Sequence, residues 1–204
     1  MQAIKHIQAA LSKAQTADDP CCVVIQYGQQ HEKPDNDRDR EKIDPRLRET
    51  IRAVAEGKSP WPLYLRGEAG SGKTCASLCM LDHYGGCYYE FPVLCSDLRL
   101  AMAGELFTPI IEGVGGFRRT EADIWQSWQG ANLAVLDDFA VRKPTDFQFE
   151  CMKKAIDTRH QKPTVFISNL SLSEINSLFD DRIASRLSAG TIFETKGDRR
   201  SEKK

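Results

Sequence analysis

Long apolar stretches are absent from this sequence of 204 residues, and no run approaches the roughly 20 residues that a membrane-spanning helix requires. A strong excess of one charge is also absent, because the formal net charge is −1. The chain as a whole is therefore not a polycation that coats nucleic acid, and contact with DNA or RNA requires a local basic patch. Since 41% of the residues are hydrophobic, we expect a core of ordinary size.

Metal-binding cysteine spacings are missing as well. The seven cysteines form no C-x-x-C pair and no recognisable zinc pattern, which favours small apolar packing residues in a reducing compartment. The first residues, MQAIKHIQAALSKAQ, have neither the apolar core nor the small-residue cleavage site of a secretory signal. We therefore expect a cytoplasmic protein without membrane contact.

Composition divides the chain into two parts. Residues 1–44 are expected to form a short amphipathic N-terminal helix and then a polar linker with few apolar residues. Residues 45–204 alternate regularly between helix-like and strand-like patterns, so we expect one domain there. Strands that alternate with helices predict an α/β fold, with a parallel sheet covered by helices on both faces.

The boundaries of the predicted elements come from periodicity and from glycine and proline positions. Helices are expected at 45–58, 73–84, 121–130 and 146–161, with another beginning at Ser96–Asp97 and a helical stretch over 179–190. Strands are expected at 61–67, 86–94, 132–139 and 163–170, and a glycine-rich segment lies at 104–120.

The stretch LRGEAGSGKTCA matches G-x-x-x-x-G-K-[ST] at every fixed position, after an apolar strand and before a helix. Glycines let successive backbone N–H groups point at phosphates, and the helix N-terminus adds partial positive charge. Lys73 can reach the β- and γ-phosphates, and the Thr74 hydroxyl can bind Mg²⁺. We therefore predict an ATP site that consists of Gly67, Glu68, Ala69, Gly70, Ser71, Gly72, Lys73, Thr74 and Cys75.

The strand LAVLDDF supplies the acidic residue that a P-loop requires. Two carboxylates at the end of an apolar strand need a partner, and Mg²⁺ with the phosphates of ATP is suited to that role. Asp137 is the predicted Walker B metal ligand beside Thr74, and Asp138 is predicted to orient or activate the attacking water. An ordinary loop or helix-cap role for Asp138 is the alternative. Since many ATPases have glutamate there, we expect hydrolysis to be slow or to depend on a partner.

Two polar positions further along the chain complete the predicted catalytic set. Asn169 follows the apolar strand PTVFIS, and a polar amide at the C-terminal end of a parallel strand lies on the ligand side of the sheet. It is predicted to hold the lytic water. Arg182 and Arg186 lie four residues apart on one helix face. Either they pair with Asp180 and Asp181 on the surface, or Arg186 is an arginine finger that reaches the γ-phosphate in a neighbouring subunit.

In this order, the glycine loop, LAVLDDFA, VFISNL, DDRIASRL and a final GDRR resemble the DnaC-type AAA+ helicase loaders. They resemble IstB, the helper ATPase of certain transposases, equally well. The resemblance covers about residues 45–200 and implies a P-loop NTPase of the AAA+ type, a three-layer sandwich with a central parallel sheet and no C-terminal lid domain. It also makes Asn169 the sensor I residue, Arg186 the arginine finger, and Arg199 or Arg200 a sensor II-like arginine at the nucleotide.

The resemblance further implies partners. It predicts ATP-dependent assembly into a homo-oligomer, a replicative helicase or a transposase as the protein client, and DNA contact, single-stranded by expectation, through residues 113–119. That segment contains Gly113, Gly115, Gly116, Arg118 and Arg119, so it is locally basic, as contact with phosphates requires.

Two other classes of function stay open at this stage. One is a P-loop phosphotransferase that acts on a small molecule, although no arginine-rich lid segment lies between Walker B and the last predicted strand. The other is a module that binds nucleotide without hydrolysing it, which the aspartate at position 138 allows. The complete Walker A and Walker B sequences favour an ATPase, and the resemblance to helicase loaders implies that it acts in DNA replication.

Overall fold

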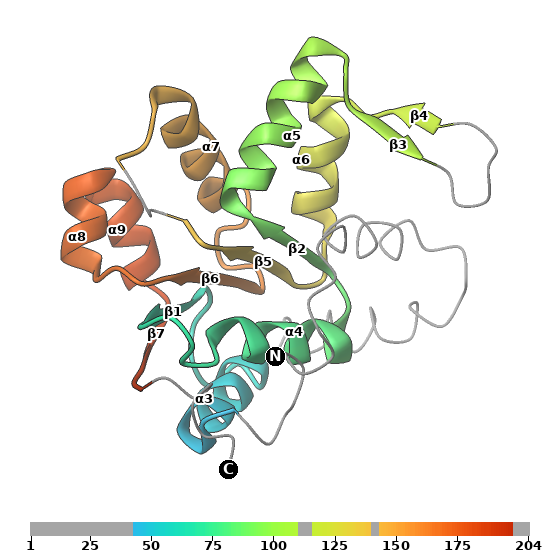
Figure 1. Ribbon diagram of the computed structural model, residues 1–204. Helices are drawn as coiled ribbons and strands as arrows, with labels where there is room; N and C mark the ends of the chain where they lie inside the picture. Colours follow the sequence, from blue (N-terminus) through green and yellow to red (C-terminus); the bar gives the residue numbers. More distant parts are fainter. Residues whose placement is uncertain (1–42, 110–115, 140–142, 198–204) are drawn as a thin grey trace.

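A parallel sheet of five strands forms the centre of the molecule (Figure 1). The computed structural model describes residues 43–109, 116–139 and 143–197. The strand order is β2-β5-β6-β1-β7, and all neighbouring pairs are parallel, so their carboxyl ends share one edge of the sheet. The strands are β1 (Leu63–Gly67), β2 (Cys87–Glu90), β5 (Ala134–Asp137), β6 (Thr164–Ser168) and β7 (Thr191–Thr195).

Helices cover both faces of this sheet and give three layers (Figure 1). On one face lie α3 (Pro45–Ala55) and α4 (Lys73–Tyr84). On the other face lie α5 (Phe91–Ala103), α6 (Glu121–Gly130), α7 (Asp146–Asp157), α8 (Leu172–Leu178) and α9 (Asp181–Ser188). The predicted α/β sandwich with a central parallel sheet is therefore confirmed, and in the described part of the chain no helix follows β7.

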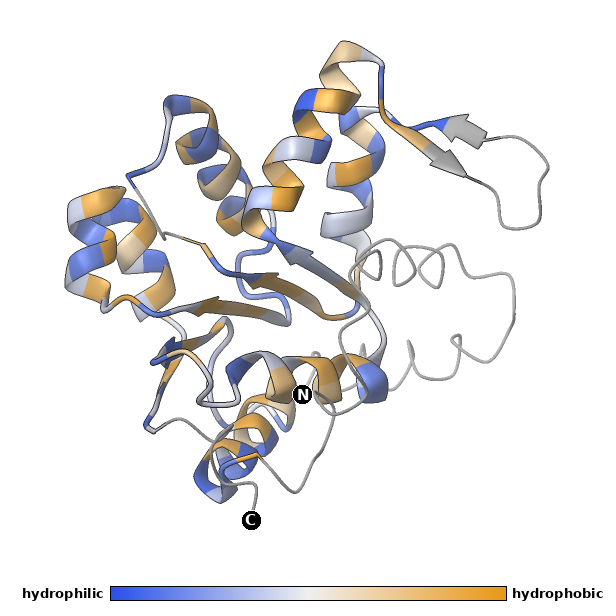
Figure 2. Cartoon of the chain, viewed as in Figure 1, coloured by the Kyte–Doolittle hydropathy of each residue, from blue (hydrophilic) through white to orange (hydrophobic). Residues whose placement is uncertain are grey.

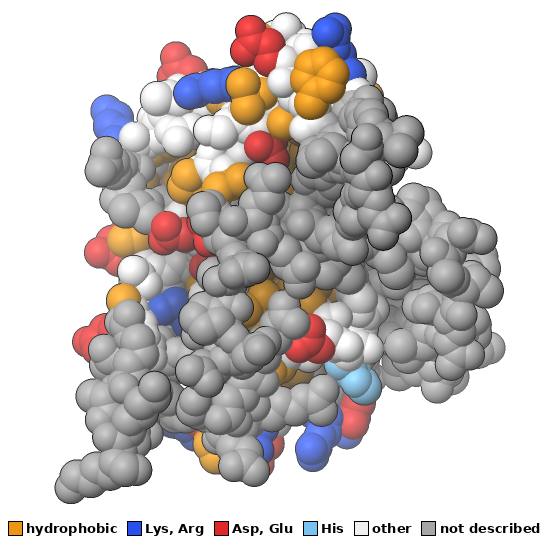
Figure 3. Space-filling model, turned by 45° about the vertical axis from the view of Figure 1, so that its right-hand side comes forward, with side chains coloured by type: hydrophobic (Ala, Val, Ile, Leu, Met, Phe, Trp, Pro, Cys, Tyr) orange, Lys and Arg blue, Asp and Glu red, His pale blue; other side chains and the backbone are white. Residues whose placement is uncertain are grey.

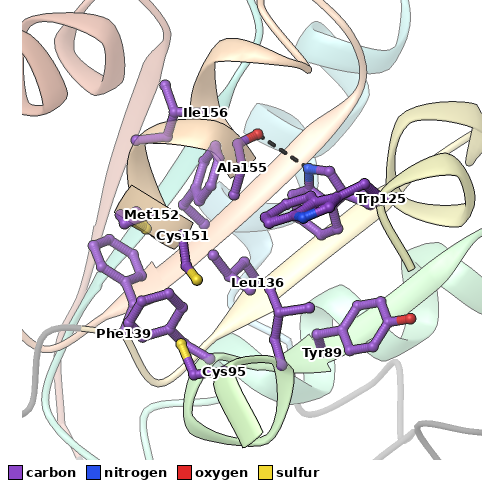
Figure 4. Packing of buried hydrophobic residues seen from close by; sticks show 14 of the residues in the cluster. Tyr89, Cys95, Trp125, Leu136, Phe139, Cys151, Met152, Ala155 and Ile156 are labelled. Atoms are coloured by element: carbon purple, nitrogen blue, oxygen red, sulfur yellow. Dashed lines mark hydrogen bonds between the residues drawn. The ribbon is translucent and has the colours of Figure 1, made fainter. Parts of the chain in front are cut away.

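The central strands are apolar because both of their faces are buried. Every residue of β5 and β6 is buried, and these strands are coloured as hydrophobic in Figure 2. The larger core lies between the sheet and the helices α5, α6 and α7, where aromatic and aliphatic side chains interlock around Leu136 and Phe139 (Figure 4). There the Trp128 indole donates a hydrogen bond of 3.0 Å to the Ala155 carbonyl, which satisfies the one polar atom of the ring.

Cysteines contribute to packing, as predicted. Cys79, Cys87, Cys95 and Cys151 are buried, and none of the described cysteines forms a disulfide. In the part of the chain that is described, no helix is both long enough and apolar enough to cross a membrane. Of the predicted segment 1–44 only two residues are described. Ile43 packs into the same core cluster as the buried residues of α3. Asp44 caps that helix, because its side chain accepts a hydrogen bond from the Arg46 N–H.

Among the predicted boundaries, the end of β2 and the start of α5 were wrong, and the helix expected over 146–161 ends at Asp157. A strand was expected over 86–94 and a helix from Ser96, but β2 ends at Glu90 and α5 begins at Phe91. Pro92 explains the difference, because proline is favoured in the first turn of a helix and cannot donate in a strand ladder. The glycine-rich segment contains a short antiparallel hairpin, β3 (Phe107–Pro109) and β4 (Gly116–Arg118). The elements α8 and β7 were not predicted, although Ser171 and Glu174 form a capping box at the start of α8.

A buried arginine ties the amino-terminal ends of the two central strands to the helices. Arg159, just after α7, is 2% exposed. Its guanidinium donates to the carbonyl oxygens of Trp128 (2.7 Å), Ala131 (2.9 Å) and Pro163 (2.7 Å) and to the Thr164 hydroxyl (2.9 Å). Burial lowers the pKa of Arg159 to about 10, so the side chain is still protonated at neutral pH. The loops before β5 and β6 are therefore fixed by one charged donor.

Candidate functional site

The predicted site residues gather where the carboxyl ends of β1, β6 and β5 meet. These three strands are neighbours, with β6 between the other two. The glycine loop follows β1, Asn169 follows β6, and Asp137 ends β5. Sequence positions about 100 residues apart therefore reach one edge of the sheet, which is where ligands bind in parallel α/β folds.

The glycine loop is shaped by backbone conformations that favour glycine. Gly67, Gly70 and Gly72 have φ angles of 137°, 83° and 90°. Gly67 also lies against Thr195 of β7, and a Cβ on Gly67 would overlap the Thr195 carbonyl. Gly72 occupies the N-cap of α4 without a side-chain cap, so the N-terminus of this helix faces the loop. Such a helix end is a site for anionic groups such as phosphate.

Lys73 is bound to the loop that precedes it. The side chain is 7% exposed, and its ammonium donates to the carbonyl oxygens of Gly67 and Glu68, each at 2.7 Å. A phosphate in the loop would offer this ammonium charged oxygens instead of neutral carbonyls, and hydrogen bonds between charged groups are about twice as strong. Lys73 is thus held where a phosphate ligand needs it.

The Walker B carboxylate is the centre of a hydrogen-bond network. Asp137 is 6% exposed, and its Oδ2 accepts from the Thr74 hydroxyl at 2.7 Å and from the Tyr88 hydroxyl at 2.8 Å. Its Oδ1 accepts from the backbone N–H of Asp138 at 2.7 Å. The two predicted metal ligands, Thr74 and Asp137, are therefore in direct contact although 63 positions separate them in the sequence.

This oxygen pair fits Mg²⁺. No group of three or more acidic, histidine or cysteine side chains that could hold a metal lies within the described residues. Mg²⁺ in nucleotide sites needs no such group, because one or two protein oxygens suffice when phosphates supply the other ligands. The Thr74 hydroxyl donates its proton to Asp137, which leaves oxygen lone pairs available to a cation.

The two predicted water-orienting residues border the same edge. Asp138 is exposed and has a φ of 57°, a left-handed conformation that is uncommon outside glycine and is found at functional sites. Asn169 is also exposed. Ser168, just before it, donates to the Phe139 carbonyl at 2.9 Å, so the chain segments after β5 and β6 are bound to each other. Asp138 and Asn169 therefore extend from neighbouring, connected strand ends.

The predicted arginine finger has a partner in its own chain. Arg186 lies on α9 and its Nε is 3.0 Å from Asp157 Oδ1, at the end of α7. Arg182, one turn earlier, is 2.9 Å from the other oxygen of the same carboxylate. The alternative prediction, that Arg182 and Arg186 pair with Asp180 and Asp181, is wrong, because both arginines form ion pairs with Asp157. Asp180 instead caps α9 by accepting from the Ile183 N–H.

The predicted DNA segment is described only in part. Residues 113–115 lie outside the described residues, as do Arg199 and Arg200. Arg118 lies on β4 opposite Phe107 of β3, with its guanidinium 5.4 Å from the centre of that ring. Arg119 is 5% exposed, so its side chain does not add to a basic surface, contrary to the prediction. Sequence alone could not separate these two adjacent arginines.

Phe107 is a residue that the sequence reasoning missed. It is 58% exposed on a hairpin that projects from the ends of α5 and α6 (Figure 1). Figure 3 shows hydrophobic side chains beside basic ones at this top end of the molecule. Exposed Leu100 and Met102 on α5 add to the apolar surface. The sequence carried no clear signal for Phe107, because its segment also contains Leu106, Ile110, Ile111, Val114 and Phe117.

Fold and site together define the class of this domain. A five-stranded parallel sheet in this order, a complete glycine loop between β1 and α4, and an acidic residue at the end of β5 in contact with Thr74 are the features of a P-loop domain.

Several solved structures of replication proteins have a similar fold. The fold is similar to the DnaC helicase loader, with a TM-score of 0.56 and 16% identity over 74% of this chain and 89% of that one. It is similar to DnaI, with a TM-score of 0.59 and 18% identity over 80% of this chain and 95% of that one. It is also similar to AMPPCP-bound DnaA from Aquifex aeolicus, with a TM-score of 0.58 and 17% identity over 76% of this chain.

These similarities concern the fold, because all the identities are low. The chain spans about half the length of the replication initiation factor and DnaA structures that it matches, 50% and 48%. Another similar structure is DnaA bound to AMPPCP and single-stranded DNA, with a TM-score of 0.59 and 16% identity over 76% of this chain and 46% of that one. No protein-family model matches the sequence, and no curated protein matches it.

Proposed function

We propose that this protein binds and hydrolyses ATP and acts in DNA replication as a helicase-loader-like AAA+ ATPase. The observation that carries the proposal is the contact of 2.7 Å between Thr74 of the glycine loop and Asp137 of β5. It joins the two halves of a magnesium-nucleotide site in a fold shared with DnaC and DnaI. A small-molecule phosphotransferase and a passive nucleotide-binding module are less well supported, because Asp138 and Asn169 accompany this pair at the same sheet edge.

The chain's own residues have distinct tasks in the proposed reaction. Lys73 exchanges the carbonyls of Gly67 and Glu68 for the β- and γ-phosphate oxygens of ATP. Thr74 and Asp137 would hold Mg²⁺, and the bound ion would supply positive charge beside the phosphates. Asp138 accepts a proton from the attacking water and Asn169 orients that water.

Action between subunits is the second part of the proposal. Arg186 completes the site of a neighbouring copy, and the ion pair with Asp157 must then open, because a guanidinium held by its own carboxylate cannot reach a phosphate elsewhere. At 28% exposure for Arg186 and 30% for Asp157, the pair is partly solvated, so its opening costs on the order of 1 kcal/mol. A neighbour's γ-phosphate offers stronger charge than one carboxylate.

DNA contact is the third part. The exposed Phe107 ring with Arg118 stacked upon it offers an aromatic surface and a positive charge on one projecting hairpin. Single-stranded DNA binds such surfaces by stacking its bases and by contact of its phosphates with arginine. A replicative helicase is the proposed protein client, and a transposase, as for IstB, is the alternative.

ATP hydrolysis over a series of protein concentrations, with and without single-stranded DNA, tests the proposal. We expect the rate of ATP hydrolysis to rise more steeply than in proportion to protein concentration, and to change when DNA is added. Lys73→Ala should abolish turnover, whereas Lys58→Ala, which removes an exposed lysine paired with Glu56, should not. Turnover that is proportional to concentration and indifferent to DNA would contradict the loader-like function and favour a self-contained phosphotransferase.

A mixing experiment tests the role of Arg186. Arg186→Ala subunits keep an intact glycine loop and Lys73→Ala subunits keep an intact arginine. If Arg186 acts on a neighbour's nucleotide, the mixture should hydrolyse ATP faster than the sum of the separate variants. Activity equal to that sum would contradict action between subunits.

A further inference from the structure

The strand β2 brings a hydroxyl to the Walker B aspartate. β2 pairs with β5 in parallel, with Tyr88 opposite Val135 and Glu90 opposite Asp137. Since side chains alternate along a strand, Tyr88 and Glu90 lie on the same face of β2. The Tyr88 hydroxyl donates to Asp137 Oδ2 at 2.8 Å across the pair of strands. Neither the glycine loop nor the sequence motifs account for this contact.

The Tyr88 bond differs from the other two bonds to Asp137 in its origin. Thr74 belongs to the glycine loop and must also serve the metal, and the Asp138 N–H belongs to the turn after β5. Tyr88 comes from a neighbouring strand of the sheet, which does not need to move when nucleotide enters. It is therefore the donor that can keep one oxygen of Asp137 in place throughout binding and turnover.

The phenol is also protected as a donor. A phenol is neutral at physiological pH, with an ordinary pKa of about 10. The hydroxyl thus keeps its proton at every physiological pH. Glu90 and Asp137 are opposed on adjacent strands, and the hydroxyl that donates to Asp137 is therefore a neutral partner for a carboxylate that has another acidic residue opposite it.

We propose that Tyr88 is a positioning residue of the magnesium-nucleotide site, whose hydroxyl holds Asp137 Oδ2 in the orientation that binds the metal. The inference rests on the proposed ATPase function. Hydrogen-bond partners of metal-binding carboxylates commonly change metal affinity 10–100-fold when they are removed. Tyr88 acts through Asp137 and does not itself contact the nucleotide.

Tyr88→Phe removes the hydroxyl and keeps the ring that packs beside β5. The matched control is Tyr89→Phe, the same chemical change one residue later, on the opposite face of β2, where the ring packs 6.3 Å from Trp128 in the core. Binding of a fluorescent ATP analogue is titrated with Mg²⁺, and separately measured in EDTA. We expect the Mg²⁺ midpoint of Tyr88→Phe to rise about 10-fold, with little change in EDTA and a lower kcat.

A double-mutant cycle with Asp137→Asn separates positioning from a general structural role. If Tyr88 acts through Asp137, then Tyr88→Phe has no further effect on the Mg²⁺ midpoint in the Asp137→Asn background. An unchanged midpoint in Tyr88→Phe alone, an equal shift in Tyr89→Phe, or a full additional shift in the double variant would each overturn the inference. If Tyr88→Phe does not fold, Tyr88→His, which keeps a donor at this position, is titrated in its place: a Mg²⁺ midpoint near that of the wild type supports the inference, and a midpoint raised as far as that of Asp137→Asn overturns it.

The same titration distinguishes the failure of this inference from the failure of the proposed function. A wild-type protein whose nucleotide binding ignores Mg²⁺ would overturn both. A wild-type protein with normal Mg²⁺ dependence, together with a Tyr88→Phe variant that matches it, would overturn only the role of Tyr88.

Discussion

Removal of the buried guanidinium of Arg159 should destabilise the whole domain. Arg159→Met keeps the apolar stem but leaves the Trp128 and Ala131 carbonyls without their donor, in a region that is almost inaccessible to water. Each buried carbonyl left unpaired costs about 1–3 kcal/mol. The variant also removes the cost of burying a cation, which the lowered pKa of Arg159 reflects, and this offsets part of the loss. We expect a net loss of about 3 kcal/mol in the free energy of unfolding.

Urea unfolding followed by circular dichroism measures this loss directly. For a chain of this size, about 3 kcal/mol corresponds to a decrease in Tm of roughly 6–12 °C. Lys162→Met is the control, because Lys162 is an exposed cation that donates to the Gln129 carbonyl at 3.2 Å in the same region. Its effect should stay within about 0.5 kcal/mol. A loss below about 1 kcal/mol for Arg159→Met would refute the argument that this donor fixes the two strand ends.

Three further predictions concern the site and its surroundings. Asp157→Asn releases Arg186 and should raise concentration-dependent ATP turnover a few-fold, and unchanged turnover at all concentrations would count against the ion pair as a restraint. Phe107→Ala and Arg118→Ala should each weaken single-stranded DNA binding, by about 1–3 kcal/mol for the stacking ring, measured by fluorescence anisotropy at fixed salt. Gly86→Ala should lower Tm strongly, because φ is 142° and a Cβ would overlap the Leu133 carbonyl, whereas Gly57→Ala, with open space around it, should cost much less.

The local parts of the fold were predictable because they depend on neighbours along the chain. The glycine loop, its flanking strand and helix, and the acidic end of β5 follow from residue order alone, and α4 and α6 begin and end at the predicted residues. The start of α5 was missed although Pro92 marked it. The residues of the proposed nucleotide site could therefore be identified from the sequence alone.

Contacts across the sheet were decided by the tertiary structure. Whether Tyr88 reaches Asp137 depends on the pairing register of β2 with β5, and one residue of slip would turn that side chain to the other face. The need for glycine at position 67 comes in part from Thr195, more than 100 positions later.

Two pairs of arginines show the same difference between what the sequence predicts and what the tertiary structure decides. Arg118 and Arg119 are adjacent and chemically identical in sequence, yet one stacks on an exposed ring and the other is buried. Arg182 and Arg186 were predicted to share a helix face, and they do share one carboxylate, but it belongs to α7 and not to their own helix. The sequence by itself determined which chemical groups and which nucleotide-binding loop are present. The packing of helices and the strand register decided which of those groups meet, because such contacts join residues that are distant along the chain.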